Sequence, residues 1–125
     1  MLRWLVIASG GFEALFGLSA LLATAVLVGG LGTTPDPSVV FFARVLGAAT
    51  LGLGVAALMA RNELKHPGGL AAAYGLALYN VLAACVILGT AATTALGGAA
   101  MWGGGLVHAV FSVLFVYALV ARRRN

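Results

Sequence analysis

The sequence predicts an all-α integral membrane protein, folded as an up-down-up-down four-helix bundle with both termini in the cytoplasm. Of its 125 residues, 62% are hydrophobic and only 8% are charged, which is too little charge to cover a soluble domain. The apolar residues form four long segments, and the positive charges gather at alternate segment ends. Because the connections are short, we expect successive helices to be antiparallel neighbours in a single transmembrane domain, residues 1–125.

The apolar segments are bounded by turn-forming or polar residues, and each is long enough to cross a hydrocarbon layer of about 30 Å. Prolines and charges occupy the first two breaks, whereas the third has no charge. The first segment is too long for a signal peptide, so we expect it to be retained. The four predicted spans cover about residues 4–30, 38–60, 69–92 and 98–121.

Lysine and arginine predict the orientation of the spans. The loops around Asp36 and Thr94 contain neither residue type. Positive residues remain preferentially in the cytoplasm, so both termini and the loop after the second span should be cytoplasmic. The basic residues near the span ends are Arg3, Arg61, Lys65 and the three arginines at 122–124.

Several classes of function receive no support from the sequence. The net charge of +4 resides mainly at span ends, where it orients helices and meets lipid headgroups, so nucleic acid is not an expected partner. No metal-ligand spacing, heme-attachment motif or phosphate loop is present, and we predict no metal and no cofactor. An enzyme using Glu13 and His108 as acid and base would lack a nucleophile, so no catalytic residue is assigned. Cys85, the only cysteine, is expected to be a buried thiol.

Polar residues inside the spans form the candidate site. Glu13, Asn80 and His108 each lie about 10 or 11 residues into a span, which places them near the same depth. A carboxylate at the membrane midplane is unfavourable by several kcal/mol unless another group receives it. Arg44 and Ser112 complete the predicted cluster, which we interpret as a ligand-binding site or a proton relay.

Arg44 decides the expected chemistry of this cluster. If Arg44 reaches inward to Glu13, the carboxylate stays ionised; if it extends outward, Glu13 should be protonated. His108 then becomes the proton-exchanging group, with Asn80 or Ser112 selecting the protonated ring nitrogen. Structural roles are the alternatives: a Glu13–Arg44 ion pair that fixes helix register, and an interior histidine bonded to an interhelical asparagine.

A row of small residues follows Arg44 along the second span. Small residues spaced four apart allow membrane helices to approach closely, so the row predicts a helix-packing stripe. It could equally receive a partner protein. The stripe comprises Ala48, Gly52, Ala56 and Ala60.

The third and fourth spans carry the phrases GLALYNVLAACVILG, residues 75–89, and GGGLVHAVFSVLFVYAL, residues 103–119. In these phrases, with Asn80 and His108, the chain resembles small four-span bacterial membrane proteins described as DoxX-like. The resemblance covers about half of the chain. It implies a bacterial inner-membrane location and proximity to a quinone or to a quinone-linked partner.

Two functions remain open at this stage. The first is a small unit whose polar cluster binds an amphipathic, lipid-like or quinone-like ligand, or supports proton-coupled movement of a solute. Four short helices leave little room for alternating access, so transport would favour a homodimer. The second is an accessory or assembly subunit of a larger membrane complex, in which the cluster is structural. Membrane lipid is the one partner that both functions share.

Overall fold

The computed structural model describes residues 1–96 and 98–123, so Arg124 of the predicted basic cluster lies outside it. The described residues contain helices and no strand. Four of the helices are long and apolar enough to cross a membrane, while α2 is much shorter. The chain is therefore an all-helical protein with the composition of a multi-pass membrane protein. The helices are α1 (Leu2–Leu22), α2 (Thr24–Gly30), α3 (Pro37–Ala60), α4 (Pro67–Thr93) and α5 (Ala99–Arg123).

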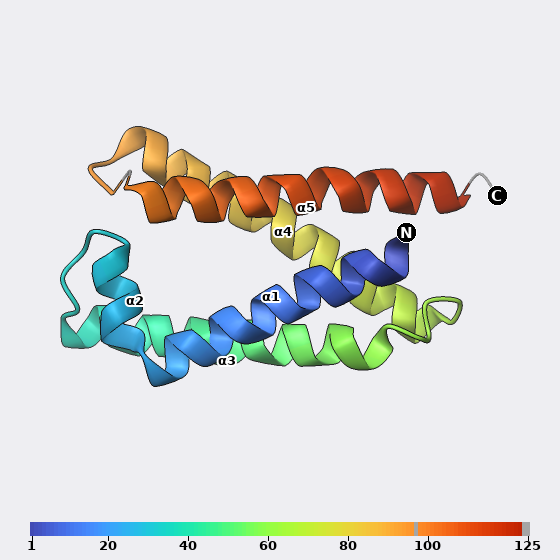
Figure 1. Ribbon diagram of the computed structural model, residues 1–125, viewed down its shortest axis with the longest axis horizontal. Coiled ribbons are helices and arrows are strands. Elements are labelled where there is room, and N and C mark those ends of the chain that lie inside the picture. Colours follow the sequence, from blue (N-terminus) through green and yellow to red (C-terminus); the bar gives the residue numbers. More distant parts are fainter. Residues whose placement is uncertain (97, 124–125) are drawn as a thin grey trace.

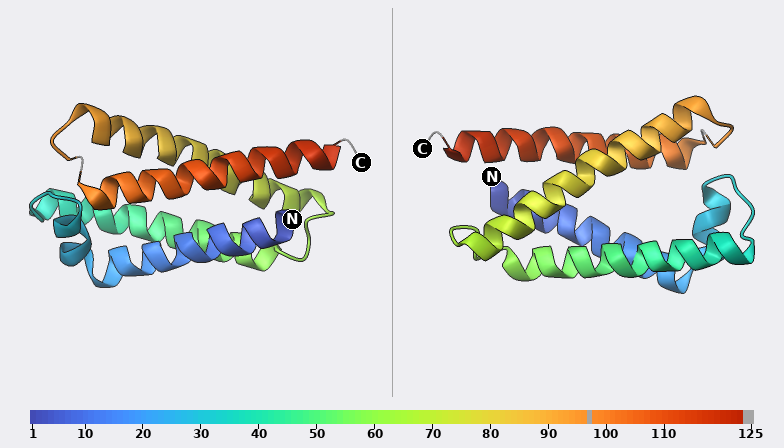
Figure 2. Two further views of the ribbon diagram at one scale, coloured as in Figure 1. Left: turned by 45° about the horizontal axis from the view of Figure 1, so that its top comes forward. Right: turned by 180° about the vertical axis from the view of Figure 1, so that it is seen from behind.

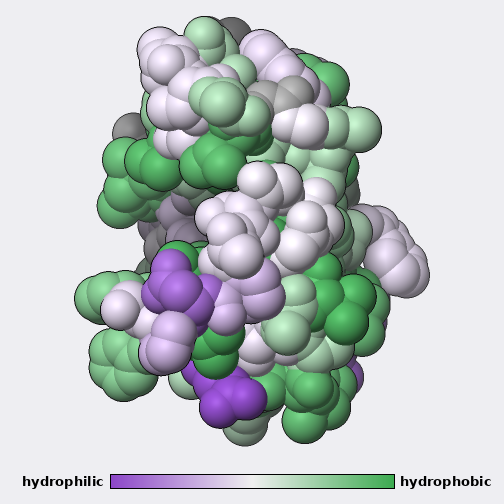
Figure 3. All heavy atoms as spheres, turned by 90° about the vertical axis from the view of Figure 1, so that its left-hand side faces the viewer, coloured by the Kyte–Doolittle hydropathy of each residue, from purple (hydrophilic) through white to green (hydrophobic). Residues whose placement is uncertain are grey.

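The long helices form two pairs. Successive long helices run in opposite directions (Figure 1), and the most extensive contacts join α1 to α3 and α4 to α5. The start of α1, the α3–α4 loop and the end of α5 lie at one end of the bundle, as the two further views also show (Figure 2). The opposite end, seen face-on in Figure 3, shows few strongly hydrophilic residues, and these gather over the α1–α3 pair. The basic loops and the weakly charged loops are thus at opposite ends.

Local signals explain where two of the long helices begin. Pro37 and Pro67 occupy the first turns of α3 and α4, where a missing N–H leaves no helical hydrogen bond unmade. Asp36 caps α3, because its Oδ1 accepts hydrogen bonds from the backbone N–H groups of Ser38 and Val39, at 2.8 and 3.0 Å. These two helices begin within two residues of the starts predicted for the second and third spans.

The first predicted span, residues 4–30, is divided in the structure. The helix breaks at Ala23, which has φ −128° and ψ 38°, and α2 then turns across the end of the bundle (Figure 1). The Ser19 and Thr24 hydroxyls each donate to the carbonyl four residues earlier, at 2.8 and 2.6 Å. Such bonds bend helices, and they account for a break that has no proline or glycine beside it.

Glycines bring α1 and α3 into backbone contact. A Cβ atom added to Gly17 of α1 would lie 2.5 Å from the carbonyl oxygen of Gly47, and one added to Gly54 of α3 would lie 2.5 Å from that of Gly10. Atoms cannot approach so closely without displacement, so each position requires glycine for this packing. The α1–α3 pair is therefore joined through small residues, as is typical of helix contacts in membranes.

The face of α3 that packs on α1 differs from the predicted stripe. In the single chain Ala48, Gly52 and Ala56 are exposed and Ala60 is half-buried. The face of α3 that packs on α1 is displaced by about one residue around the helix from the predicted stripe. The small residues that contact α1 belong to this displaced face. Cys85, expected to be buried, is likewise exposed on α4. The buried residues of α3 are Gly47, Thr50, Gly54 and Ala57.

The hydrophobic core lies toward the end of the bundle that holds the start of α1 and the end of α5. Phe115 of α5 and Leu76 of α4 are fully buried there, together with Val6 of α1. Residues from α1, α3, α4 and α5 all contribute, so this cluster joins the two helix pairs. A layer of buried polar side chains begins one turn farther along α1, at Ser9.

Candidate functional site

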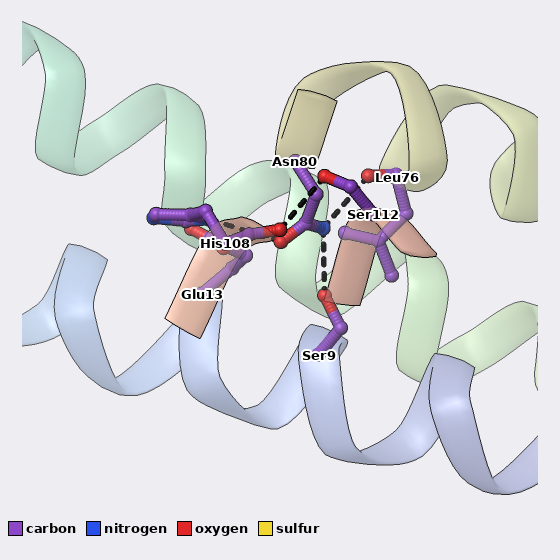
Figure 4. A network of polar contacts seen from close by, with 6 residues as sticks. All are labelled: Ser9, Glu13, Leu76, Asn80, His108 and Ser112. Carbon is purple, nitrogen blue, oxygen red and sulfur yellow. Dashed lines mark hydrogen bonds and ion pairs between the residues drawn. The ribbon is translucent and has the colours of Figure 1, made fainter. Parts of the chain in front are cut away.

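A polar layer joins three helices in the interior of the bundle. Ser9 and Glu13 of α1 and Asn80 of α4 have no accessible surface, and His108 of α5 retains 6%. Their side chains point toward one another (Figure 4). Glu13 lies near the middle of α1 and Asn80 is the central residue of α4. The equal depth that residue counting predicts for Glu13, Asn80 and His108 is therefore present as direct proximity.

Asn80 is the hub of this layer. Its Nδ2 donates to Ser9 Oγ at 2.9 Å and to the Leu76 carbonyl at 2.8 Å, and its Oδ1 lies 2.9 Å from His108 Nδ1. A carbonyl only accepts, so the Leu76 contact fixes the orientation of the amide. Oδ1 must then accept from the imidazole, and Nδ1 is the ring nitrogen that carries hydrogen.

Two aromatic rings hold the His108 imidazole. Phe12 and Tyr79 meet it edge-on, with ring centroids 5.7 and 5.6 Å away. The other ring nitrogen, Nε2, points away from Asn80 (Figure 4), and the hydrogen bonds of the described residues do not include it. The imidazole is therefore fixed in orientation, while one of its nitrogens has no hydrogen-bond partner in the part of the chain that the structure describes.

Glu13 is buried without adequate hydrogen bonds. Its Oε1 lies 3.6 Å from His108 Nδ1, beyond hydrogen-bond distance, and neither carboxyl oxygen has a hydrogen-bond partner among the described residues. The Tyr79 hydroxyl interacts with the carboxyl without meeting hydrogen-bond geometry. An ionised carboxylate in such surroundings is unfavourable by several kcal/mol. The arrangement favours a neutral carboxyl group beside a neutral imidazole.

The structure does not bring Arg44 to Glu13. Arg44 is exposed on α3, and its Nε donates to Thr24 Oγ1 at 3.2 Å, at the break between α1 and α2. Of the two predicted orientations the outward one is observed, because the Thr24 hydroxyl offers an acceptor nearer the outer end. No ion pair joins Arg44 to Glu13 in the part of the chain that the structure describes. Its role in ligand binding stays a prediction.

Ser112 lies next to the polar layer without entering it. Its hydroxyl donates to the His108 backbone carbonyl at 2.7 Å, within α5 (Figure 4). Asn80, of the two predicted alternatives, is thus the residue that selects the imidazole tautomer. Ser9, Phe12 and Tyr79 were not predicted as site residues, although Ser9 could have been found because it lies one turn before Glu13.

An apolar groove between α4 and α5 is separate from the polar layer. Its lining residues include none of Ser9, Glu13, Asn80 and His108, so it gives no access to the imidazole. Such a surface is ordinary for helices that face acyl chains. The groove is lined by Tyr74, Ala77, Leu78, Val81, Val116, Leu119 and Val120.

Within residues 1–96 and 98–123, no three His, Cys, Asp or Glu side chains lie close enough to hold a metal ion. Comparison of the chain with protein-family models, with curated proteins and with solved structures gave no match. The chemistry of the site must therefore be argued from its geometry. That geometry offers a hydrogen-bond acceptor and an exchangeable proton in an otherwise apolar interior.

Proposed function

We propose that the chain is a small multi-pass membrane protein that binds a small amphipathic ligand at His108, near the membrane midplane. The observation that supports this is an imidazole fixed by Asn80, Phe12 and Tyr79 whose second nitrogen has no hydrogen-bond partner among the described residues. Buried polar groups in membrane spans are unfavourable and typically serve a function.

Proton coupling is part of the same proposal. The interior contains two groups that can each bind or release a proton, the Glu13 carboxyl and the His108 imidazole, and a proton-coupled ligand or solute requires such groups. DoxX-like membership, a bacterial inner membrane and cytoplasmic termini also belong to this proposal. They are supported by the phrases around Asn80 and His108 and by the basic residues at one end of the bundle.

Co-purification tests ligand binding without naming the ligand in advance. Protein purified in mild detergent is extracted with organic solvent, and the extract is analysed by mass spectrometry. We expect a small amphipathic compound in wild-type extracts that is lost from His108→Ala and retained in Val110→Ala, an exposed position on the same helix. Equal recovery from both variants, or no compound in the wild type, would contradict the proposal.

A second function, an accessory subunit of a larger complex, is favoured by one observation. Ala48, Gly52 and Ala56 leave a face of small residues on α3 uncovered in the single chain. Either a second copy or another membrane protein could pack there. Affinity capture in mild detergent tests it: a stoichiometric partner should be lost on Gly52→Leu and kept on Gly75→Leu, where a side chain also meets open space. A wild-type chain that runs alone would exclude this function.

A further inference from the structure

A glycine with open space beside it lies one turn before His108 on α5. Gly104 precedes His108 by one turn on α5, and long side chains on helices lean toward the preceding turn. A Cβ atom added to Gly104 would meet nothing within 4 Å. Space for another molecule therefore exists at Gly104, one turn of α5 from His108.

The tautomer of His108 determines which chemical group can bind in this space. Because Nδ1 donates to Asn80, Nε2 of a neutral imidazole carries a lone pair and can only accept a hydrogen bond. The other titratable groups that face the ring are Glu13 from α1 and Tyr79 from α4, and within the described residues α3 contributes none. Glu13 lies on the Nδ1 side, and residues 1–96 and 98–123 supply no donor to Nε2.

We infer that the ligand is a lipid-soluble hydroxyl compound whose O–H donates a hydrogen bond to His108 Nε2 over Gly104. This inference rests on the proposed function and narrows it to one chemical class. Phe12 and Tyr79 border the imidazole, so the apolar part of the ligand meets aromatic rings beside its hydroxyl. Phenols and aliphatic alcohols share the required donor.

Three probes distinguish the contribution of the ligand's hydroxyl group to the binding affinity from that of its apolar part. Nonylphenol, its methyl ether and decanol are titrated into the full-length protein in lipid nanodiscs, with binding measured by calorimetry. The methyl ether lacks the donor and should bind about tenfold more weakly than nonylphenol, which corresponds to one hydrogen bond. Tighter binding of nonylphenol would indicate that the natural ligand is a phenol, and tighter binding of decanol would indicate that it is an aliphatic alcohol.

Glycine variants of α5 test where the ligand binds. Gly104→Leu should abolish binding by filling the space, whereas Gly103→Leu, which also meets nothing within 4 Å, should leave it unchanged because it lies on another face of α5. Wild-type affinity in Gly104→Leu would overturn the inference. In the free protein, the nitrogen-15 spectrum of His108 should show hydrogen on Nδ1 and none on Nε2, and the opposite tautomer would also overturn it.

The two proposals can fail separately. Equal affinity for nonylphenol and its methyl ether, with both weakened by His108→Ala, overturns the hydroxyl inference and leaves ligand binding at His108 intact. If none of the three probes binds, or if His108→Ala changes nothing, the proposed function fails and the inference fails with it.

Discussion

Gly54 of α3 rests directly against the backbone of Gly10 of α1. A Cβ atom on Gly54 would lie 2.5 Å from the Gly10 carbonyl oxygen, and one on Gly10 would lie 3.2 Å from that of Gly54. This reciprocal contact packs the two helices backbone against backbone. It also fixes the rotation of α1 that directs Ser9 and Glu13 toward α4 and α5.

Gly54→Leu should therefore destabilise the fold by about 2 kcal/mol or more, because backbone atoms cannot move aside as a flexible side chain can. Gly52→Leu is the matched control, since a side chain there meets nothing within 4 Å. Unfolding in mixed micelles, followed by circular dichroism, measures both. If the Gly52 variant were the less stable one, the predicted stripe and not the observed face would hold the helices together.

Asn80→Ala should lower the free energy of unfolding by about 1 to 2 kcal/mol. The substitution leaves the Ser9 hydroxyl and His108 Nδ1 without their partner, although hydrogen bonds in membranes are individually modest. Thr93→Ala, which removes an exposed bond within α4, is the control and should change stability little. The same unfolding assay applies. Equal stability of the two variants would show that the hydrogen bonds of Asn80 do not stabilise the fold.

Glu13→Gln should fold with a free energy of unfolding within about 1 kcal/mol of the wild type. The amide has nearly the shape of a neutral carboxyl group, and the basic side chain beside Glu13 is the His108 imidazole, which is neutral in this arrangement. The infrared spectrum of the wild type should contain the carbonyl band of a protonated carboxyl group, and this band should vanish in the variant. A loss of several kcal/mol would instead indicate an ionised carboxylate paired with imidazolium.

Arg44→Gln should loosen α2 without affecting the polar layer. The lost contact joins α3 to Thr24, so hydrogen exchange of the amides in α2 should accelerate while exchange around Asn80 stays constant. Arg61→Gln, at the other end of α3, is the control for loss of charge. Should Arg44→Gln accelerate exchange around Asn80 as strongly as around α2, the inward orientation, one of the two alternatives for Arg44, would be favoured.

Cysteine labelling tests the proposed orientation in the membrane. In a Cys85→Ala background, a membrane-impermeant thiol reagent should label Asp36→Cys in intact cells and Lys65→Cys only after permeabilisation. Asp36 precedes α3 at the weakly charged end of the bundle, and Lys65 lies in the loop before α4. The reverse labelling pattern would place both termini outside the cytoplasm.

Hydropathy predicted the long helices well because a bilayer leaves few alternatives. Every backbone group in the hydrocarbon layer must be bonded internally, so an apolar run of sufficient length becomes a helix. The predicted span 38–60 corresponds to Pro37–Ala60, and 69–92 to Pro67–Thr93. Counting residues also predicted the meeting of Asn80 and His108, because depth in a bilayer follows from distance along a helix.

Faces and side-chain directions could not be predicted in the same way. In α3 small residues line two adjacent faces, one through Gly54 and one through Gly52, and lipid tails are as apolar as a neighbouring helix. Only the fit of α1 selects between them. The direction of Arg44 depended on the Thr24 hydroxyl, which became available through a helix break that hydropathy does not register.

The division of the bundle into an α1–α3 pair and an α4–α5 pair has a consequence for biosynthesis. Translation completes the first hairpin before the second has emerged from the ribosome, so Ser9 and Glu13 enter the bilayer before Asn80 and His108 have been made. During that interval a neutral carboxyl group can reside among acyl chains far more readily than a charged one. Insertion of the second hairpin then seals the acidic side chain away from lipid, and the nascent chain acquires its finished interior only at that step.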